Sequence, residues 1–143
     1  MNAEEYLSRY RDLNNSINDL LEERNRWIDI ATKVTPSKRH EQTGTVSDKV
    51  GDTVPEIVDI ENQINAKIDE LVKLRREIKR TISAVSDKRY RSLLTRYYML
   101  GMSWEAVAKS FGRDVRTIYK WRRKALDEVE KIIKFYKIHC FSV

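Results

Sequence analysis

Cysteine, proline and glycine are all scarce in this sequence of 143 residues. The single cysteine, Cys140, excludes an intramolecular disulfide and favours a reducing compartment. Four glycines and two prolines are too few for an all-β fold, which needs a turn roughly every ten residues. No apolar run reaches the roughly 18 residues of a membrane span, and the charged N-terminus lacks the apolar stretch of a signal peptide. The sequence therefore predicts a cytoplasmic protein without a membrane segment.

Residue patterns for catalysis, metal binding and cofactor binding are missing as well. The two histidines, His40 and His139, lie far apart, and no His/Cys cluster has the spacing of a zinc site. The sequence also has no glycine-rich phosphate loop and no nucleophile elbow. We therefore expect a protein that is not an enzyme and that holds no metal or cofactor.

Positive charge is concentrated in the C-terminal part of the chain. The formal net charge is +6, yet residues 1–85 carry 14 Lys/Arg against 16 Asp/Glu. Residues 86–143 carry 14 Lys/Arg against 6 Asp/Glu. This asymmetry predicts a C-terminal module that binds a polyanion, attached to a neutral or acidic support.

Apolar residues recur at steps of three and four in two long stretches, which predicts two amphipathic helices in residues 1–85. The first seam consists of Tyr6, Tyr10, Leu13, Ile17, Leu20, Arg24, Trp27, Ala31 and Val34. The second consists of Ile57, Ile60, Ile64, Ile68, Leu71, Leu74, Ile78, Ile82 and Val85. The expected arrangement is an antiparallel, coiled-coil-like hairpin. It would either close within one chain or associate into a homodimer or higher homo-oligomer.

The segment between the two seams, residues 35–53, predicts a mobile connection. Pro36 would end the first helix, because its ring clashes with a continuing turn. Gly44 and Gly51 stand among polar residues, which suits an irregular segment. The second helix is expected to begin near Asp52 or Thr53, either of which could cap it, with Pro55 in its first turn.

Residues 86–130 predict three helices that end in a helix-turn-helix. The first would run over residues 88–100, closed by Gly101, and the second over residues 104–111, capped by Ser103. Gly112 would form the turn and Asp114 would cap the third helix. The apolar residues of the helix crossing would be Val107, Ala108, Phe111, Ile118 and Trp121.

The stretch LLTRYYMLGMSWEAVAKSFGRDVRTIYKWRRKALDEVEKI resembles region 4 of sigma-70-type factors, and in particular phage late-gene transcriptional regulators of the ArpU/RinA type. The elements at Ala31–Thr35 and Ser47–Asp52 are similar to those of small phage proteins with the same C-terminal motif. This resemblance implies a DNA-binding transcriptional regulator of phage late genes in a bacterial host cell. Arg113 is a departure from it, because such turns usually bury an aliphatic residue there.

The third helix of this motif carries the candidate DNA-binding residues. Recognition helices place their N-terminal turns in the major groove, where Arg and Lys donate to guanine O6 and N7. We expect Arg116, Tyr119 and Lys120 near base edges, with Val115 or Thr117 against a thymine methyl or a phosphate. The expected phosphate contacts come from Arg113, Arg122, Arg123 and Lys124.

Two other partners remain open for this module. Sigma-type domains also touch RNA polymerase, so the chain could act as a polymerase-binding appropriator. A phage packaging subunit that recognises DNA, like a small terminase, also combines a helix-turn-helix with helical oligomerisation. The apolar tail, residues 131–143, would pack on the domain, pair with a second copy or dock on polymerase.

Overall fold

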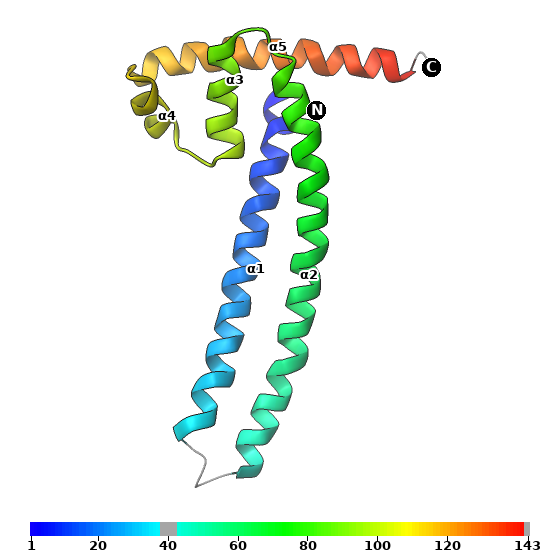
Figure 1. The fold of residues 1–143 in the computed structure, drawn as a ribbon, viewed down its shortest axis with the longest axis vertical. Helices are drawn as coiled ribbons and strands as arrows, with labels where there is room; N and C mark the ends of the chain where they lie inside the picture. The colour runs from blue at the N-terminus through cyan, green and yellow to red at the C-terminus, as the bar shows by residue number, and fades with distance from the viewer. Residues whose placement is uncertain (38–42, 142–143) are drawn as a thin grey trace. The chain divides into compact units, whose positions relative to one another are not determined.

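The structure, a computed structural model, describes the backbone of residues 1–37 and 43–141 and the side chains of residues 1–33 and 51–137. Its elements are α1 (Ala3–Ser37), α2 (Thr43–Ser83), α3 (Lys88–Leu94), the π-helical turn η1 (Thr95–Met99), α4 (Trp104–Phe111) and α5 (Val115–Phe141), as Figure 1 shows. The described residues contain no strand, and the predicted all-α class is confirmed. No described helix is both long enough and apolar enough to cross a membrane.

The two long helices follow the predicted seams with two corrections. The helix α2 begins at Thr43, so the predicted start near Asp52 is wrong, and Pro55 lies inside the helix. Proline removes one hydrogen bond and disturbs one turn, and here the helix continues on both sides of that turn. Ile68 was predicted to lie in the buried seam, but it is 41% exposed. The regular step of three places the half-buried Lys67 there instead.

The predicted connection at residues 35–53 is therefore largely helical in the structure. α1 ends at Ser37, one residue beyond the proline that was expected to stop it, and residues 43–53 belong to α2. Residues 38–42 lie outside the described part of the chain.

The chain forms two compact units, each built from parts of both long helices. Unit 1 comprises residues 1–12 and 72–143, and unit 2 comprises residues 13–71. The expected division into residues 1–85, 86–130 and 131–143 remains a prediction, although both of its boundaries fall inside unit 1. Unit 1 carries 21 Lys/Arg against 10 Asp/Glu, whereas unit 2 carries 7 against 12.

Unit 1 has a continuous apolar core to which every one of its helices contributes. Fully buried members include Leu7, Ile78, Leu93, Ile118 and Val129. The start of α1 is also held by polar contacts: the Tyr6 hydroxyl and the Thr81 hydroxyl are 2.9 Å apart, and Arg9 donates to Glu77 at 3.0 Å. These contacts tie the N-terminal turns of α1 to the C-terminal turns of α2, as an antiparallel pair requires.

Unit 2 has a much thinner core along one seam. Ile17 of α1 is buried with Ile60 and Ile64 of α2, and half-buried Leu20, Leu21, Trp27 and Leu71 pack around them. The polar seam residue Arg24 is half-buried. Several large apolar side chains of this unit stay exposed, namely Ile28, Ile30, Val54, Val58 and Ile68.

The apolar tail is a continuation of α5 through Phe141. Ile132 and Ile133 pack against the core of unit 1, while Phe135 and Tyr136 are 55% and 37% exposed. The side chains of the other tail residues that entered the predictions, His139 and Cys140 included, lie outside the described residues, as does His40.

Candidate nucleic-acid interface

Local features fix both ends of α4 and the start of α5. Ser103 caps α4, since its hydroxyl accepts from the Ala106 N–H at 3.1 Å. Gly112 ends α4 in the left-handed region, with φ 65° and ψ 32°. Asp114 then caps α5 by accepting from the Thr117 N–H at 3.0 Å. These three local predictions are confirmed.

The same cap sets the ionisation of Asp114. The backbone N–H of Thr117, and to a lesser extent that of Arg116, stabilises the carboxylate, so the pKa of Asp114 is lowered from its ordinary value. The carboxylate therefore stays ionised at the positive end of the α5 dipole, where negative charge stabilises a helix.

Apolar packing at the crossing of α4 and α5 determines which face of α5 points outward. Val107 and Ala108 of α4 are buried against Ile118 of α5, and the rings of Phe111 and Trp121 meet edge to face at 5.7 Å. Ala125 and Val129 continue the buried stripe of α5. Because Ile118 is fully buried, residues about half a turn away from it must face solvent.

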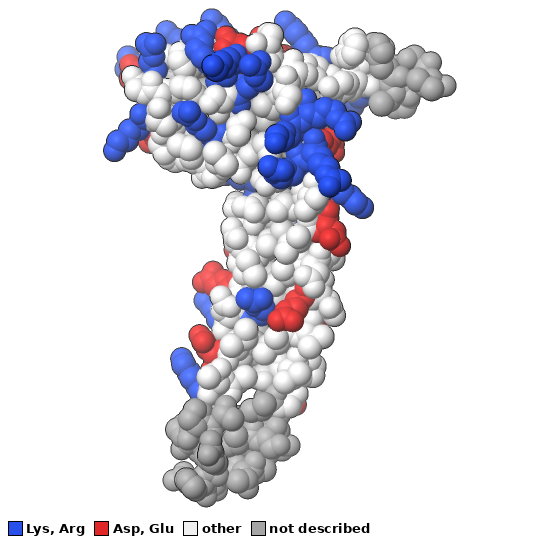
Figure 2. All heavy atoms as spheres, viewed as in Figure 1, with Lys and Arg blue, Asp and Glu red and all other residues white. Residues whose placement is uncertain are grey.

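The outward face of α5 is basic. Arg116, Lys120, Arg123 and Lys124 are all exposed, and so is Arg113 in the turn before the helix. Among the described residues, none of these five side chains takes part in an ion pair. Figure 2 shows Lys and Arg side chains gathered over α4 and the adjoining half of α5. The charge on this face is therefore available to a ligand.

Three of the candidate residues lie between this face and the core. Val115 and Thr117 are half-buried, and Val115 packs against the core cluster. Tyr119 is 42% exposed, and its ring approaches that of Trp104 at 6.3 Å. Trp104 also stacks on Tyr97, with the two ring centroids 3.8 Å apart. The Tyr119 ring therefore lies beside a stacked pair of aromatic rings.

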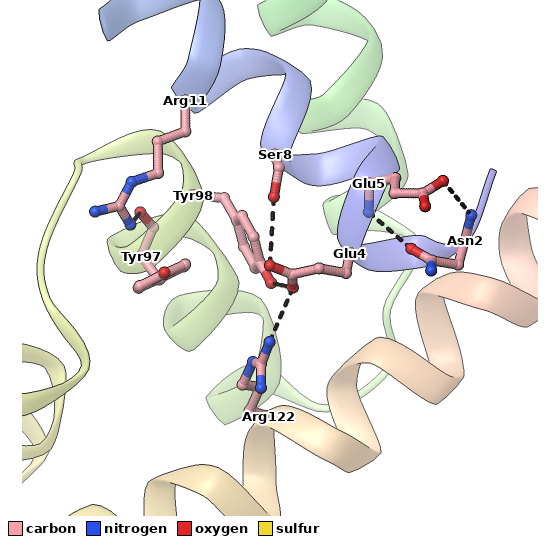
Figure 3. Close-up of polar contacts among 8 residues, drawn as sticks. All are labelled: Asn2, Glu4, Glu5, Ser8, Arg11, Tyr97, Tyr98 and Arg122. Atoms are coloured by element: carbon pink, nitrogen blue, oxygen red, sulfur yellow. Dashed lines mark hydrogen bonds and ion pairs between the residues drawn. The ribbon is translucent and has the colours of Figure 1, made fainter.

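Arg122 differs from the other candidates, because its guanidinium is engaged within the protein. Its Nη2 donates to Glu4 Oε2 at 3.2 Å, and the hydroxyl of the buried Tyr98 donates to the same carboxylate oxygen (Figure 3). The guanidinium also lies 5.2 Å from the Trp104 ring centroid. The guanidinium of the half-buried Arg122 is therefore engaged within unit 1, and Arg122 is not counted among the interface residues.

Burial raises the pKa of Tyr98 well above its ordinary value, and the Glu4 carboxylate raises it further. The phenol consequently remains a hydrogen-bond donor throughout the physiological range of pH. This contact joins residues 94 positions apart in the chain, so no local sequence pattern could have predicted it.

Three arginines outside α5 lie over the rings of Phe111 and Trp121. Arg96 stands 4.3 Å from the Phe111 centroid and Arg113 stands 5.9 Å from that of Trp121. Arg89, which is paired with Asp87 at 3.2 Å, approaches Trp121 from another side at 4.9 Å. Trp104 and Trp121 are both half-buried and pack against the core of unit 1.

No group of three or more His, Cys, Asp and Glu side chains that could hold a metal ion occurs within the described part of the chain. The chain belongs to the DUF1492 family. The family's description reads "Protein of unknown function (DUF1492)", and its profile matches residues 33–130. The matched region contains the last residues of α1, all of α2, α3, η1 and α4, and α5 as far as Glu130. No curated protein and no solved structure matches the chain.

Proposed function

We propose that this chain is a non-catalytic, sequence-specific DNA-binding protein of the bacterial cytoplasm that regulates transcription of phage genes. The observation that carries the proposal is the exposed basic face of α5, whose side chains form no ion pair with any described residue. This face is held outward by the capped turn at Gly112 and by the buried Ile118. A single helix presented in this way fits the major groove of B-form DNA, which is about 12 Å wide.

The roles of the side chains follow from their positions on the helix. Arg116, Tyr119 and Lys120 lie in the first two turns of α5 and would contact base edges. Arg123 and Lys124 lie one turn further and, with Arg113, would contact phosphates. If about six phosphates are neutralised, the logarithm of the binding constant falls with the logarithm of the salt concentration at a slope of about −5.

Self-association through unit 2 would present two such helices to one duplex. The exposed Ile28, Ile30, Val54, Val58 and Ile68 leave apolar surface that a second hairpin would cover. Two linked modules bind more tightly than one, because the second contact becomes intramolecular. Light scattering of the full chain is expected to give a dimer. A ring of eight or more copies would favour the packaging-subunit alternative.

The proposal is tested by selecting genomic fragments that bind the full chain and measuring their affinity in a salt series. Arg116→Ala/Lys120→Ala is expected to lose about 100-fold in affinity for a selected site, since each specific base contact is worth roughly 1–3 kcal/mol. Arg26→Ala/Lys33→Ala in unit 2 removes the same charge from exposed positions and should leave the affinity unchanged. Equal losses in the two variants, or no selected fragment at all, would reject sequence-specific binding.

The polymerase alternative predicts a different pattern for the same variants. RNA polymerase subunits would then be retained by immobilised protein, and the retention would survive the loss of Arg116 and Lys120. Polymerase retention without salt-sensitive DNA binding would replace our proposal with that alternative.

A further inference from the structure

A second basic surface lies on α2, outside the region from α3 to α5. Residues 73–80 contain five exposed basic side chains, namely Lys73, Arg75, Arg76, Lys79 and Arg80. They belong to unit 1, as α5 does. Figure 2 shows Lys and Arg side chains gathered on the end of α2 that adjoins α3, on the face of unit 1 that this view presents.

Buried neighbours fix the direction in which these side chains point. Ile78 is completely buried and Thr81 is 1% exposed, so the side of α2 that carries Ile78 and Thr81 faces the core. Positions 73, 76 and 80 follow the i, i+3, i+7 spacing of one helix face, and that face lies about opposite Ile78. We refer to Lys73, Arg76 and Arg80 as the α2 basic face.

The charge on the α2 basic face is not balanced within the described structure. Glu77 is the one acidic residue between positions 72 and 86, and it accepts from Arg9 of α1 at 3.0 Å. No ion pair among the described residues involves Lys73, Arg76 or Arg80. Like charges at i, i+3 and i, i+4 repel by a few tenths of a kcal/mol per pair, and a polyanion would relieve that repulsion.

The same helix changes its sign of charge where it passes from unit 2 into unit 1. Residues 43–71 of α2 carry seven Asp/Glu and two Lys/Arg, whereas residues 72–83 carry one Asp/Glu and five Lys/Arg. A general need for solubility would not concentrate the basic residues of α2 in unit 1. The segregation indicates a partner that approaches unit 1 and is itself negatively charged.

We propose that the α2 basic face contacts DNA phosphates on the same duplex that α5 reads, flanking the bases that α5 contacts. This inference rests on the proposed function and extends its interface beyond the helix-turn-helix. Phosphate contacts need only exposed Lys and Arg at helix surfaces, and such contacts position a protein on the duplex. A protein partner fits less well, because Val72 is the one exposed large apolar side chain among residues 72–86 and protein interfaces have an apolar centre.

The test compares Arg76→Ala/Arg80→Ala with the matched control Arg26→Ala/Lys33→Ala in the full chain. All four side chains are exposed on long helices, and alanine favours a helix, so both variants should fold like the wild type. We expect Arg76→Ala/Arg80→Ala to bind the selected DNA at least about tenfold more weakly, with a salt slope smaller in magnitude by about 2. Hydroxyl-radical footprinting should lose protection of the flanking sugars and keep protection at the central bases.

Each alternative outcome has a distinct meaning. If wild type binds DNA through Arg116 and Lys120 but the Arg76→Ala/Arg80→Ala variant matches its control, this inference is wrong and the proposed function stands. If wild type binds no DNA, both are wrong. If Arg76→Ala/Arg80→Ala binds DNA normally yet loses retention of polymerase subunits, the α2 basic face contacts an acidic protein instead.

Discussion

Unit 1 and unit 2 are built from the same two long helices, yet they differ in charge and in core. Unit 2 is acidic, and among its described side chains Ile17, Ile60 and Ile64 form the buried cluster. Unit 1 is strongly basic and surrounds α5 with a core drawn from every one of its helices. A thin seam with apolar residues left outside suits association with another hairpin, whereas a well-packed basic unit suits rigid presentation of charge to a polyanion.

Division by structure also sharpens the charge asymmetry read from the sequence. A boundary at residue 85 assigns the basic residues of the α2 basic face to the support, and the excess of the C-terminal part then looks smaller. When residues 72–85 are counted with the unit in which they pack, unit 1 holds all the positive excess and unit 2 has more acidic than basic residues.

The largest expected difference between the two units is the effect of deleting isoleucine side chains. Ile118→Ala should lower the free energy of unfolding by about 3 kcal/mol, because the side chain is fully buried and leaves a cavity. Ile68→Ala, at a 41% exposed position of unit 2, should change it by less than about 0.5 kcal/mol. Urea denaturation measures both, and equal losses would contradict the described division of the core.

A smaller effect is expected from the hydroxyl that Tyr98 donates to Glu4. Tyr98→Phe should lower the free energy of unfolding by about 1.5 kcal/mol, since it leaves the partly buried Glu4 carboxylate with one hydrogen bond fewer. Tyr97→Phe is the matched control, because no hydrogen bond among the described residues involves the Tyr97 hydroxyl. Thermal unfolding of the two variants should separate them, and a neutral Tyr98→Phe would argue against the contact.

The glycines of the two units should respond to alanine in opposite directions. Gly112→Ala should cost about 1 kcal/mol, because Gly112 has φ 65° and an L side chain is strained there. Gly51→Ala should gain up to about 1 kcal/mol, since Gly51 lies within α2 and its added methyl would meet no atom within 4 Å. Urea denaturation that gave the same sign for both would contradict the assigned turn.

The smallest expected effect concerns the pH dependence of the α5 cap. The pKa of Asp114 is lowered in the folded chain. The stability that the ionised Asp114 carboxylate contributes to the fold is therefore present above the ordinary pKa of 3.8 and is lost as the pH falls through the lowered pKa. Asp114→Asn keeps a capping oxygen but does not titrate. The stability difference between wild type and Asp114→Asn should therefore shrink on acidification, and a constant difference between about pH 6 and about pH 2.5 would contradict this assignment.

Local features of the fold were predictable from the sequence, and contacts between distant segments were not. The caps at Ser103 and Asp114 and the turn at Gly112 depend on the residue itself and a few neighbours, so sequence predicted them. The predicted start of α2 is wrong because Gly51 is typical of an irregular segment and Pro55 of a first helical turn, whereas the helix continues through both residues. Lys67, and not Ile68, lies in the seam, because the regular step along the helix decides which position is buried and the hydrophobicity of the side chain does not.

The candidate site divides in the same way. The exposure of Arg116, Lys120 and Arg123 follows from the spacing of Ile118, Trp121 and Ala125 on one helix. The engagement of Arg122 depends on Glu4, which is 118 residues away in the chain. The membership of residues 73–80 in the basic unit likewise depends on which part of α2 packs with α5, and no periodicity carries that information.

The central claim is that the exposed face of α5 reads DNA sequence, and selection from a random duplex pool tests it most directly. Wild-type protein is expected to enrich one sequence motif. Arg116→Ala/Lys120→Ala should lose the preference at one or two positions of that motif, while Arg26→Ala/Lys33→Ala should enrich the wild-type motif unchanged. Enrichment of no motif by the wild type, or of the identical motif by Arg116→Ala/Lys120→Ala, would contradict the claim.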